Sequence, residues 1–283
     1  MESPMRTFCL PLAAAFLLAA TAVQAESQLP PAPAFSYADM ADLALAAPVA
    51  AHVKVAKAQL LKKEQAAGVA ATHARYLVDA DIVALIRAPR GLPSRVRYVV
   101  DLPRDAKGKP PKLRKGTQLL LLAGPVAGQP GEIRLVAPDA QIPYDPPRAA
   151  QLRAILTEAT GASPAPRITG IGRAFHVPGA IRGESETQIF LQTADGRPVS
   201  LNVLRRPGQT PIWAVALGEI VDEAAGPPAR DTLLWYRLAC TLPRALPRQS
   251  LAEADSAGIT AIQADYRLII DRLGPCPRNR ARS

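Results

Sequence analysis

Hydrophobic residues alternate with polar ones over much of the N-terminal half of the chain. The clearest case is 95–102, where Val96, Tyr98 and Val100 alternate with Arg95 and Arg97. Such alternation is typical of strands with one buried face. Four further segments carry a strand pattern, so five strands are expected, at 51–61, 74–86, 95–102, 118–123 and 132–136. Short strands separated by turn residues predict a small antiparallel barrel or sandwich, and their number is compatible with an OB-type barrel.

Two segments of this half depart from simple alternation. Residues 118–123 contain four consecutive leucines, which indicates a strand buried on both faces. Residues 103–116 are rich in Pro and Lys, and they predict a loop where an OB-type barrel often has a helix.

The C-terminal half predicts an antiparallel meander. Segments 187–193 and 198–205 flank Asp195-Gly196, a strong hairpin signal because both turn residues tolerate positive φ. Segment 212–221 and the apolar run 233–240 are expected to be the next strands. The fold class is therefore mainly β (α+β), with a barrel followed by a meander that a C-terminal helix covers.

Helices are expected at three places. Ser36 to Asp39 has the spacing of a capping box and predicts a short helix that ends at Pro48. Asp145 followed by Pro146 predicts a second helix start. The segment around it is the best domain boundary, with a barrel-like domain at 49–145 and a helix, sheet and closing helix at 146–283.

The closing helix is predicted from periodicity. Ser250 to Glu253 has capping-box spacing, and Gly274-Pro275 is a helix stop. Apolar residues between them recur at three- and four-residue intervals, at Ile259, Ile262, Tyr266, Ile269, Ile270 and Leu273. Gly258 leaves open a kink or two shorter helices.

The first 25 residues have the pattern of a secretory signal peptide. An apolar run at 8–23 follows Arg6, and Val23-Gln24-Ala25 is a small-residue cleavage site. The run is shorter than the ~20 residues that a membrane span needs. Residues 26–48 are then a Pro-rich lead-in and the short helix. An uncleaved N-terminal anchor is the alternative, and cleavage would leave no transmembrane segment.

The expected export affects how the cysteines are interpreted. Cys9 lies within the signal segment, so Cys240 and Cys276 form an even pair in the mature chain. An exported pair predicts a disulfide that pins the closing helix, whereas two buried free thiols are the alternative.

The chain carries a net charge of +10. Basic charge on an exported protein favours acidic lipids, polyanionic glycans or acidic proteins over nucleic acid. Six basic residues gather in the loop between the third and fourth strands, and they are candidates for anion binding: Arg104, Lys107, Lys109, Lys112, Arg114 and Lys115. No aromatic residues are interleaved with them, which argues against single-stranded nucleic acid. A solvated connection without a ligand is the alternative.

No catalytic, metal or cofactor motif is found. His52, His73 and His176 lack partners at metal-ligand spacing. The carboxylate pairs Asp79/Asp81 and Asp222/Glu223 lack the aromatic platform of a sugar site. His176 is the one histidine that warrants inspection for catalysis.

The sequence therefore predicts an exported, non-enzymatic binding or scaffold protein of the cell envelope, which contacts an envelope polyanion or acidic protein through its basic loop. An exported hydrolase, with a site assembled at the interdomain cleft around 144–148, is the alternative. A protein inhibitor is a third option, for which the sequence has no reactive-loop signature. The oligomeric state stays open.

Overall fold

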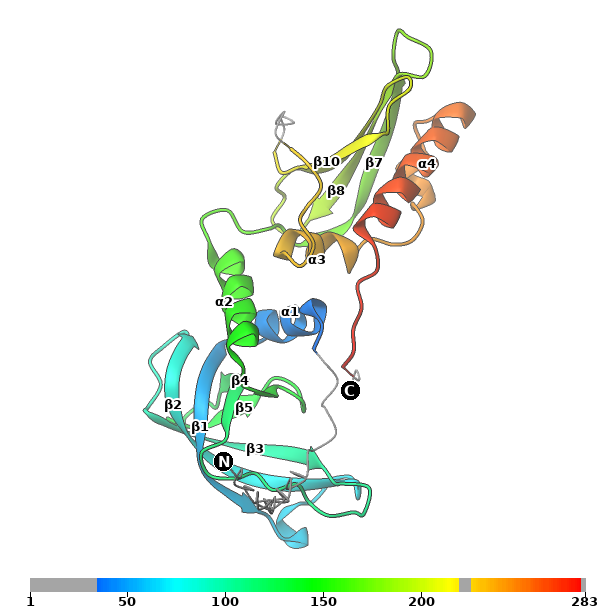
Figure 1. The fold of residues 1–283 in the computed structure, drawn as a ribbon. Helices are drawn as coiled ribbons and strands as arrows, with labels where there is room; N and C mark the ends of the chain where they lie inside the picture. Colours follow the sequence, from blue (N-terminus) through cyan, green and yellow to red (C-terminus); the bar gives the residue numbers. More distant parts are fainter. Residues whose placement is uncertain (1–34, 219–224, 281–283) are drawn as a thin grey trace, which may run out of the picture. The chain divides into compact units, whose positions relative to one another are not determined.

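The computed structural model describes residues 35–218 and 225–280, and Figure 1 shows their arrangement. The expected signal peptide, most of the Pro-rich lead-in and the pair Asp222/Glu223 lie outside the described residues. Within the described ranges no helix is both long and apolar enough to cross a membrane.

The first helix, α1 (Tyr37–Ala46), begins as expected. The Ser36 hydroxyl accepts the Asp39 N–H, and the Asp39 carboxylate accepts the Ser36 N–H, so the capping box is confirmed. Asp39 is fully buried. Its carboxylate also accepts hydrogen bonds from the backbone N–H groups of Asn279 and Arg280, near the end of the chain.

The five expected strands of the N-terminal half form a nearly closed antiparallel barrel, with the strand order β3-β2-β1-β4-β5. A parallel bridge between Arg97 and Glu132 brings β3 next to the start of β5 and nearly closes the ring. A short sixth strand pairs with β4. The strands are β1 (Val49–Leu60), β2 (His73–Arg87), β3 (Arg95–Pro103), β4 (Gln118–Pro125), β5 (Ile133–Leu135) and β6 (Gln141–Pro143), and a 3₁₀ turn, η1 (Lys63–Gln65), lies between β1 and β2.

The four leucines of β4 are buried on both faces, as expected. Leu119 and Leu121 belong to the core inside the barrel. Leu120 and Leu122 belong to a second core, which they share with α1 and with α2 (Pro146–Thr160). The side chains of this one strand therefore pack alternately into two cores, because successive side chains of a strand point to opposite faces.

The helix α2 starts where the sequence places it. The Asp145 side chain accepts the Arg148 N–H at 2.8 Å, with Pro146 in the first turn.

The second sheet is a meander with the order β10-β9-β8-β7. It comprises β7 (Ile168–Pro178), β8 (Ser185–Thr193), β9 (Val199–Arg205) and β10 (Ile212–Ala216). The Asp195-Gly196 hairpin is confirmed, with Gly196 at φ 75°. The expected strand at 212–221 ends earlier, at Ala216, and residues 219–221 lie outside the described ranges.

The expectation of a strand at 233–240 is wrong. These residues form the helix α3 (Leu233–Ala239), whose first turn is capped by the Thr232 hydroxyl on the Trp235 N–H. A short apolar run fits a strand or a buried helix equally well, and here the cap decides. The fourth strand of the meander is instead β7, at its other edge.

The capping box expected at Ser250 to Glu253 is also wrong. Ser250 lies in a 3₁₀ turn, η2 (Arg248–Leu251), and Glu253 pairs with Arg173. The closing helix α4 (Ser256–Leu273) begins six residues later, because Asp255 caps the Gly258 N–H at 2.7 Å. Gly258 is thus in the first turn and makes no kink. The helix stop at Gly274 is confirmed, with φ 71°.

Cys240 and Cys276 form the expected disulfide, with their Cα atoms 5.2 Å apart. Because residues 233–239 are helical, the bond joins the end of α3 to the segment after α4, not a helix to a strand.

The residues that follow Cys276 form a strap, defined here as residues 277–280. The Ser36 hydroxyl donates to the Pro277 carbonyl oxygen at 2.7 Å. Arg278 pairs with Asp42 of α1 at 2.6 Å, and Arg280 pairs with Asp139 of the barrel, also at 2.6 Å. The Tyr236 hydroxyl of α3 donates to the same Asp42 carboxylate. The strap therefore ties α1, α3 and the barrel to the chain end.

Removing the disulfide should destabilise the fold. The bond closes a loop with a sequence separation of 36 residues, so Cys240→Ala with Cys276→Ala should lower the free energy of unfolding by roughly 3–4 kcal/mol. Urea unfolding of the oxidised protein measures this. Dithiothreitol should shift the wild type towards the double variant and leave the variant unchanged; equal urea midpoints for oxidised wild type and variant would contradict the prediction.

Acid should weaken the strap through Asp42. Burial acts to raise the pKa of this carboxyl, but hydrogen bonds from Arg278 and Tyr236 outweigh burial and lower the pKa below its ordinary 3.8. A carboxyl with a lowered folded-state pKa stabilises the fold above its ordinary pKa, and this stability is lost as the pH falls through the folded-state pKa. We expect Asp42→Asn to lower stability at pH 7 and to reduce the further loss below pH 3.8.

Urea midpoints at pH 7 and at acid pH test this expectation. Asp195→Asn is the matched control, because Asp195 also pairs with an arginine, but on an exposed hairpin. An acid sensitivity that is the same in wild type and Asp42→Asn would show that the strap carboxylate contributes nothing.

Candidate functional site

The basic loop at 103–116 is held against the barrel along its length. The Gly116 N–H donates to the Val55 carbonyl at 2.8 Å, and the Tyr76 hydroxyl donates to the Pro111 carbonyl at 2.5 Å. Leu113 packs on the barrel core. The loop is therefore an ordered surface of the barrel, and its backbone positions are set by β1 and β2.

The six predicted residues divide into two groups. Arg104 is half-buried and donates to the His73 and Gly108 carbonyl oxygens, so it holds the loop. The other five side chains are exposed, and within the described ranges none has a salt-bridge partner: Lys107, Lys109, Lys112, Arg114 and Lys115. Asp105, the loop's one acid, accepts the backbone N–H groups of Lys107 and Lys109.

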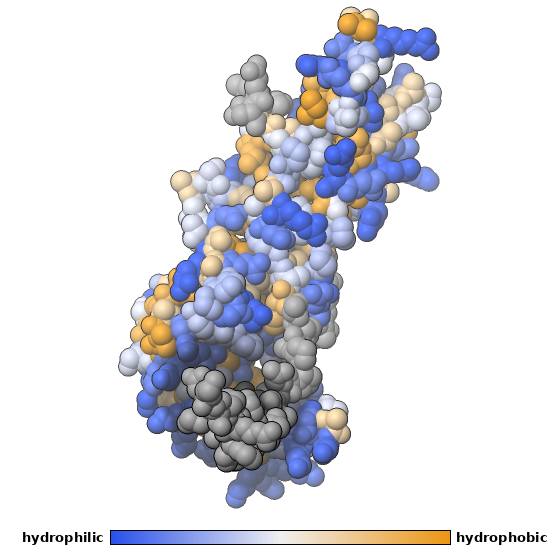
Figure 2. Space-filling view, in the orientation of Figure 1, coloured by the Kyte–Doolittle hydropathy of each residue, from blue (hydrophilic) through white to orange (hydrophobic). Residues whose placement is uncertain are grey.

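The positive charge extends beyond the loop onto β1 and β3. A hydrogen bond from Arg95 lowers the pKa of Asp81, and the charges of Arg95, Lys115 and Lys54 act in the same direction. Three cations thus surround one exposed carboxylate. Residues 49–145 hold 16 Lys and Arg against 8 Asp and Glu, so the barrel carries +8 of the chain's +10. The described residues at the lower end of the barrel are mostly hydrophilic in the view of Figure 2. We call the loop cations together with Lys54 and Arg95 the basic face.

Asp79 and Asp81 do not form a carboxylate pair for acid–base chemistry. Each pairs across β2 and β3 with an arginine at 2.7 Å, Asp79 with Arg97 and Asp81 with Arg95. Each carboxylate is therefore bonded to its own arginine.

The segment 144–148, the expected place of a cleft site, is engaged in packing. The Tyr144 ring stacks on the His52 ring at 3.7 Å, and His52 Nε2 bonds the Gln118 side chain at 2.8 Å. Arg148 donates to the Pro143 carbonyl and pairs with Asp145. His73 bonds Thr72. Among the described residues no three His, Cys, Asp or Glu side chains lie close enough together to hold a metal ion.

His176 belongs to a polar network between β7, β8, β9 and α4. Thr187, which is fully buried, donates its hydroxyl hydrogen to Asp265 at 2.5 Å, and Arg205 donates to the same carboxylate at 2.7 Å. His176 Nδ1 lies 2.9 Å from the Thr187 oxygen. Because the only hydroxyl hydrogen of Thr187 goes to Asp265, Nδ1 must carry the proton that bonds Thr187. The network fixes one tautomer of His176.

A pocket of about 430 Å³ lies at His176, between β7 and the start of α4. Phe175, Pro178 and Ala257 give it apolar walls, and Glu253 and Asp255 give it acidic ones. Thr187 is a hydroxyl within hydrogen-bond reach of His176, the arrangement that a hydrolase would need. Its oxygen is buried and already bonded, however, so it is not available to attack a substrate.

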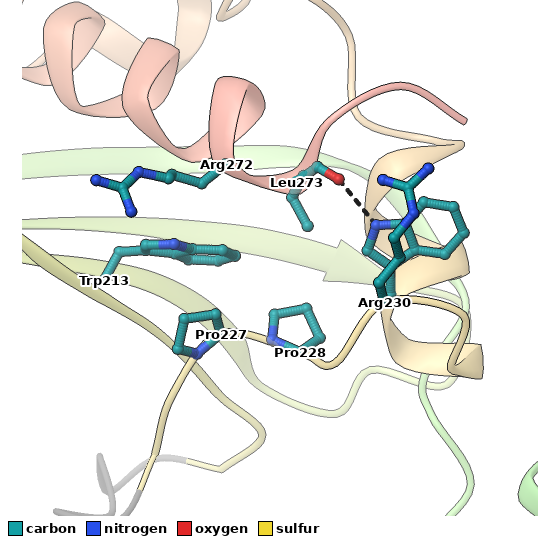
Figure 3. Close-up of a pocket in the computed structure, with 7 residues that line it drawn as sticks. Trp213, Pro227, Pro228, Arg230, Arg272 and Leu273 are labelled. Atoms are coloured by element: carbon teal, nitrogen blue, oxygen red, sulfur yellow. Dashed lines mark hydrogen bonds between the residues drawn. The ribbon is translucent and has the colours of Figure 1, made fainter. Parts of the chain in front are cut away.

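A second pocket lies between the end of α4 and the segment before α3 (Figure 3). Trp213, Trp235, Arg230 and Arg272 line it. Sequence analysis places both tryptophans in strands of the core and does not bring the two arginines together. No short motif could have found this pocket, because it is assembled from four separate segments.

Comparison with known proteins adds no assignment. No protein-family model matches this chain, and no curated protein matches it. A proposal for the function must therefore be based on the chemistry of the described surfaces.

The network around Asp265 should contribute measurably to stability. Thr187→Val removes a hydrogen-bond donor from a buried carboxylate, so we expect the free energy of unfolding to fall by about 1–3 kcal/mol. Thr187→Ser keeps the hydroxyl and should recover most of that loss. Urea unfolding compares the two variants, and ¹⁵N NMR of the imidazole should find the proton on Nδ1 of His176 in the wild type. Equal stability of the Val and Ser variants would show that the hydroxyl is dispensable.

Proposed function

We propose that the protein is an exported, non-enzymatic binding protein that holds an anionic partner on the basic face of its barrel. The observation that carries the proposal is the set of five exposed loop cations without salt-bridge partners among the described residues. A cation near an anionic surface contributes roughly 1 kcal/mol, so five of them together are enough for binding.

The anchored backbone of the loop supports this function. Bonds to Val55 and Tyr76 hold the loop on the barrel before any partner arrives. A partner then meets cations whose backbone positions are already set, and less conformational entropy is lost on binding. A solvated connection with no ligand would need none of these bonds.

The kind of partner follows from the compartment. The Cys240–Cys276 disulfide is compatible with an oxidising, exported environment, and the N-terminal sequence supports export. Envelope polyanions and acidic proteins are the anions such a protein meets. The loop has no aromatic side chain on which a base could stack, which makes nucleic acid a poorer fit.

The competing proposal, an exported hydrolase, has weaker support. Its expected place at 144–148 is occupied by the His52–Tyr144 stack and the Arg148 contacts. His176 donates its Nδ1 proton to Thr187, and among the described residues this buried hydroxyl is the one bonded to it.

Neutralising the loop should weaken binding to a polyanion. We expect Gln substitution at Lys107, Lys109, Lys112, Arg114 and Lys115 to raise the dissociation constant for dextran sulfate at least about tenfold at low salt, and to flatten its salt dependence. Arg104 stays unchanged because it holds the loop. Fluorescence anisotropy with labelled dextran sulfate measures both effects.

The matched control removes the same charge from the C-terminal half. It replaces five exposed arginines whose side chains have no hydrogen-bond or salt-bridge partner among the described residues, namely Arg182, Arg206, Arg244, Arg248 and Arg267. If the control loses as much affinity as the loop variant, net charge and not the basic face binds the probe. Unchanged binding by the loop variant would overturn the proposal outright.

A further inference from the structure

The second pocket shares no residue with the barrel. It has a volume of about 230 Å³. Trp213 of β10 lies at its floor, Pro227 and Pro228 lie on one side, and the last turn of α4 lies on the other (Figure 3). The remaining lining residues come from the segment that leads into α3 and from α3 itself, namely Arg230 and Trp235.

The aromatic wall of this pocket is fixed in place. The Trp235 indole N–H donates to the Leu273 carbonyl oxygen at 2.9 Å, the bond drawn in Figure 3. Both tryptophans are almost fully buried. The Arg230 guanidinium lies 5.0 Å from the centre of the Trp235 ring, within range of a cation–π interaction. The apolar part of the pocket therefore needs no rearrangement before a ligand enters.

The charge of the pocket is entirely positive. Arg230 and Arg272 are exposed, neither has a salt-bridge partner within the described ranges, and no Asp or Glu lines the pocket. Guanidinium groups bind carboxylate and phosphate through paired hydrogen bonds. The end of α4 carries a partial negative charge of roughly half a unit, which two full positive charges outweigh. Its carbonyl oxygens at Ile270 and Leu273 already accept hydrogen bonds from Gly274 and Trp235.

The backbone around Arg230 is unusual on both sides. Asp231 has φ 58°, and it is the one non-glycine residue in the described ranges with a positive φ. Such a conformation is strained and is retained where the surroundings require it. On the facing side Gly274 has φ 71°, and a Cβ there would lie 3.3 Å from Arg230 Nη1. The backbone is thus strained at Asp231, next to Arg230. Gly274 has no side chain, which leaves room for the Arg230 guanidinium group.

We propose that this pocket binds a small oxyanion, carboxylate or phosphate, attached to an apolar body. In Figure 3 the guanidinium group of Arg272 lies beside Trp213, whereas that of Arg230 lies at the other end of the pocket, against Trp235. Arg272 would therefore hold the oxyanion, while Trp213, Pro227 and Leu273 would contact the apolar body. The volume is below the ~300 Å³ at which drug-sized sites begin, so the ligand is a small acid or a single side-chain-sized group. The site is distinct from the basic face, because the two share no residue.

The chain supplies its own reporter for the test. It contains two tryptophans, and both line this pocket, so tryptophan emission reports binding without a label. Hexanoate and hexyl phosphate are the probes, and hexanol and hexylammonium are controls of matched apolar length. We expect a saturable change with the two anions and none with the controls. The tighter of the two anions identifies carboxylate or phosphate as the preferred group; saturation by hexanol at the same concentration would overturn the proposal.

Substitution assigns the effect to Arg272. Arg272→Gln should raise the dissociation constant roughly tenfold, equivalent to about 1.4 kcal/mol. Arg267→Gln is the control, because Arg267 is an exposed arginine of α4 that does not line the pocket. Arg230→Gln should have a smaller effect, because its guanidinium group lies at the other end of the pocket. Arg272 has no described bond that its loss would break.

The absence of a saturable change with either anion, or an affinity that Arg272→Gln leaves unchanged, would overturn the proposal. The loop variant of the basic face should bind hexanoate or hexyl phosphate as the wild type does. Failure at one site is therefore distinguishable from failure at the other.

Discussion

A buried carboxylate at the start of α1 is the constraint on which the arrangement of the chain end depends. Asp39 is fully buried, and it accepts hydrogen bonds from the backbone N–H groups of Ser36, Asn279 and Arg280. A buried charge without such donors would cost several kcal/mol. The first helix can thus bury this aspartate in the core because the last described residues of the chain return to it.

This return of the chain end couples the two halves of the molecule. The strap follows the disulfide directly, so α3, α4, α1 and the Asp139 segment of the barrel are joined within a few residues. One hydrophobic cluster also contains side chains from α1, β4, α2, the meander and α4. The pocket between α3 and α4 depends on this assembly, because its residues are brought together by the packing of four segments. The basic face depends on it much less, since its loop is bonded to β1 and β2 of its own barrel.

The same contrast explains what the sequence could predict. Strands with regular alternation, the Asp195-Gly196 hairpin, the α1 and α2 starts and the disulfide depend on local patterns or on one pairing, and all are observed. The run 233–240 was mispredicted because seven of its eight residues are apolar and such a run fits two structures, and only the Thr232 cap separates them. Ser250 and Asp255 both offer a helix start, and the preceding 3₁₀ turn leaves the second as the cap.

β7 was not identified because its pattern is broken. Register shifts interrupt its pairing with β8, and Gly170 and Gly172 lie within it. A Cβ at Gly172 would lie 3.3 Å from the Phe190 carbonyl oxygen, so the glycine permits a close approach of the two strands. In a sequence, such glycines indicate a turn. In this structure they lie inside a strand and allow close packing against its neighbour.

The two candidate sites differ most in how they use charge. Exposed cations attract any polyanion over about one Debye length, roughly 8 Å at physiological ionic strength, so the basic face offers attraction with little selectivity. The pocket between α3 and α4 offers positive charge beside fixed apolar walls, so its ligand must match a shape as well as a charge. Salt screens the exposed cations of both sites, but it does not weaken apolar contacts. Binding at the basic face should therefore fall more steeply with ionic strength than binding in the pocket, which separates the two sites on the unmodified protein.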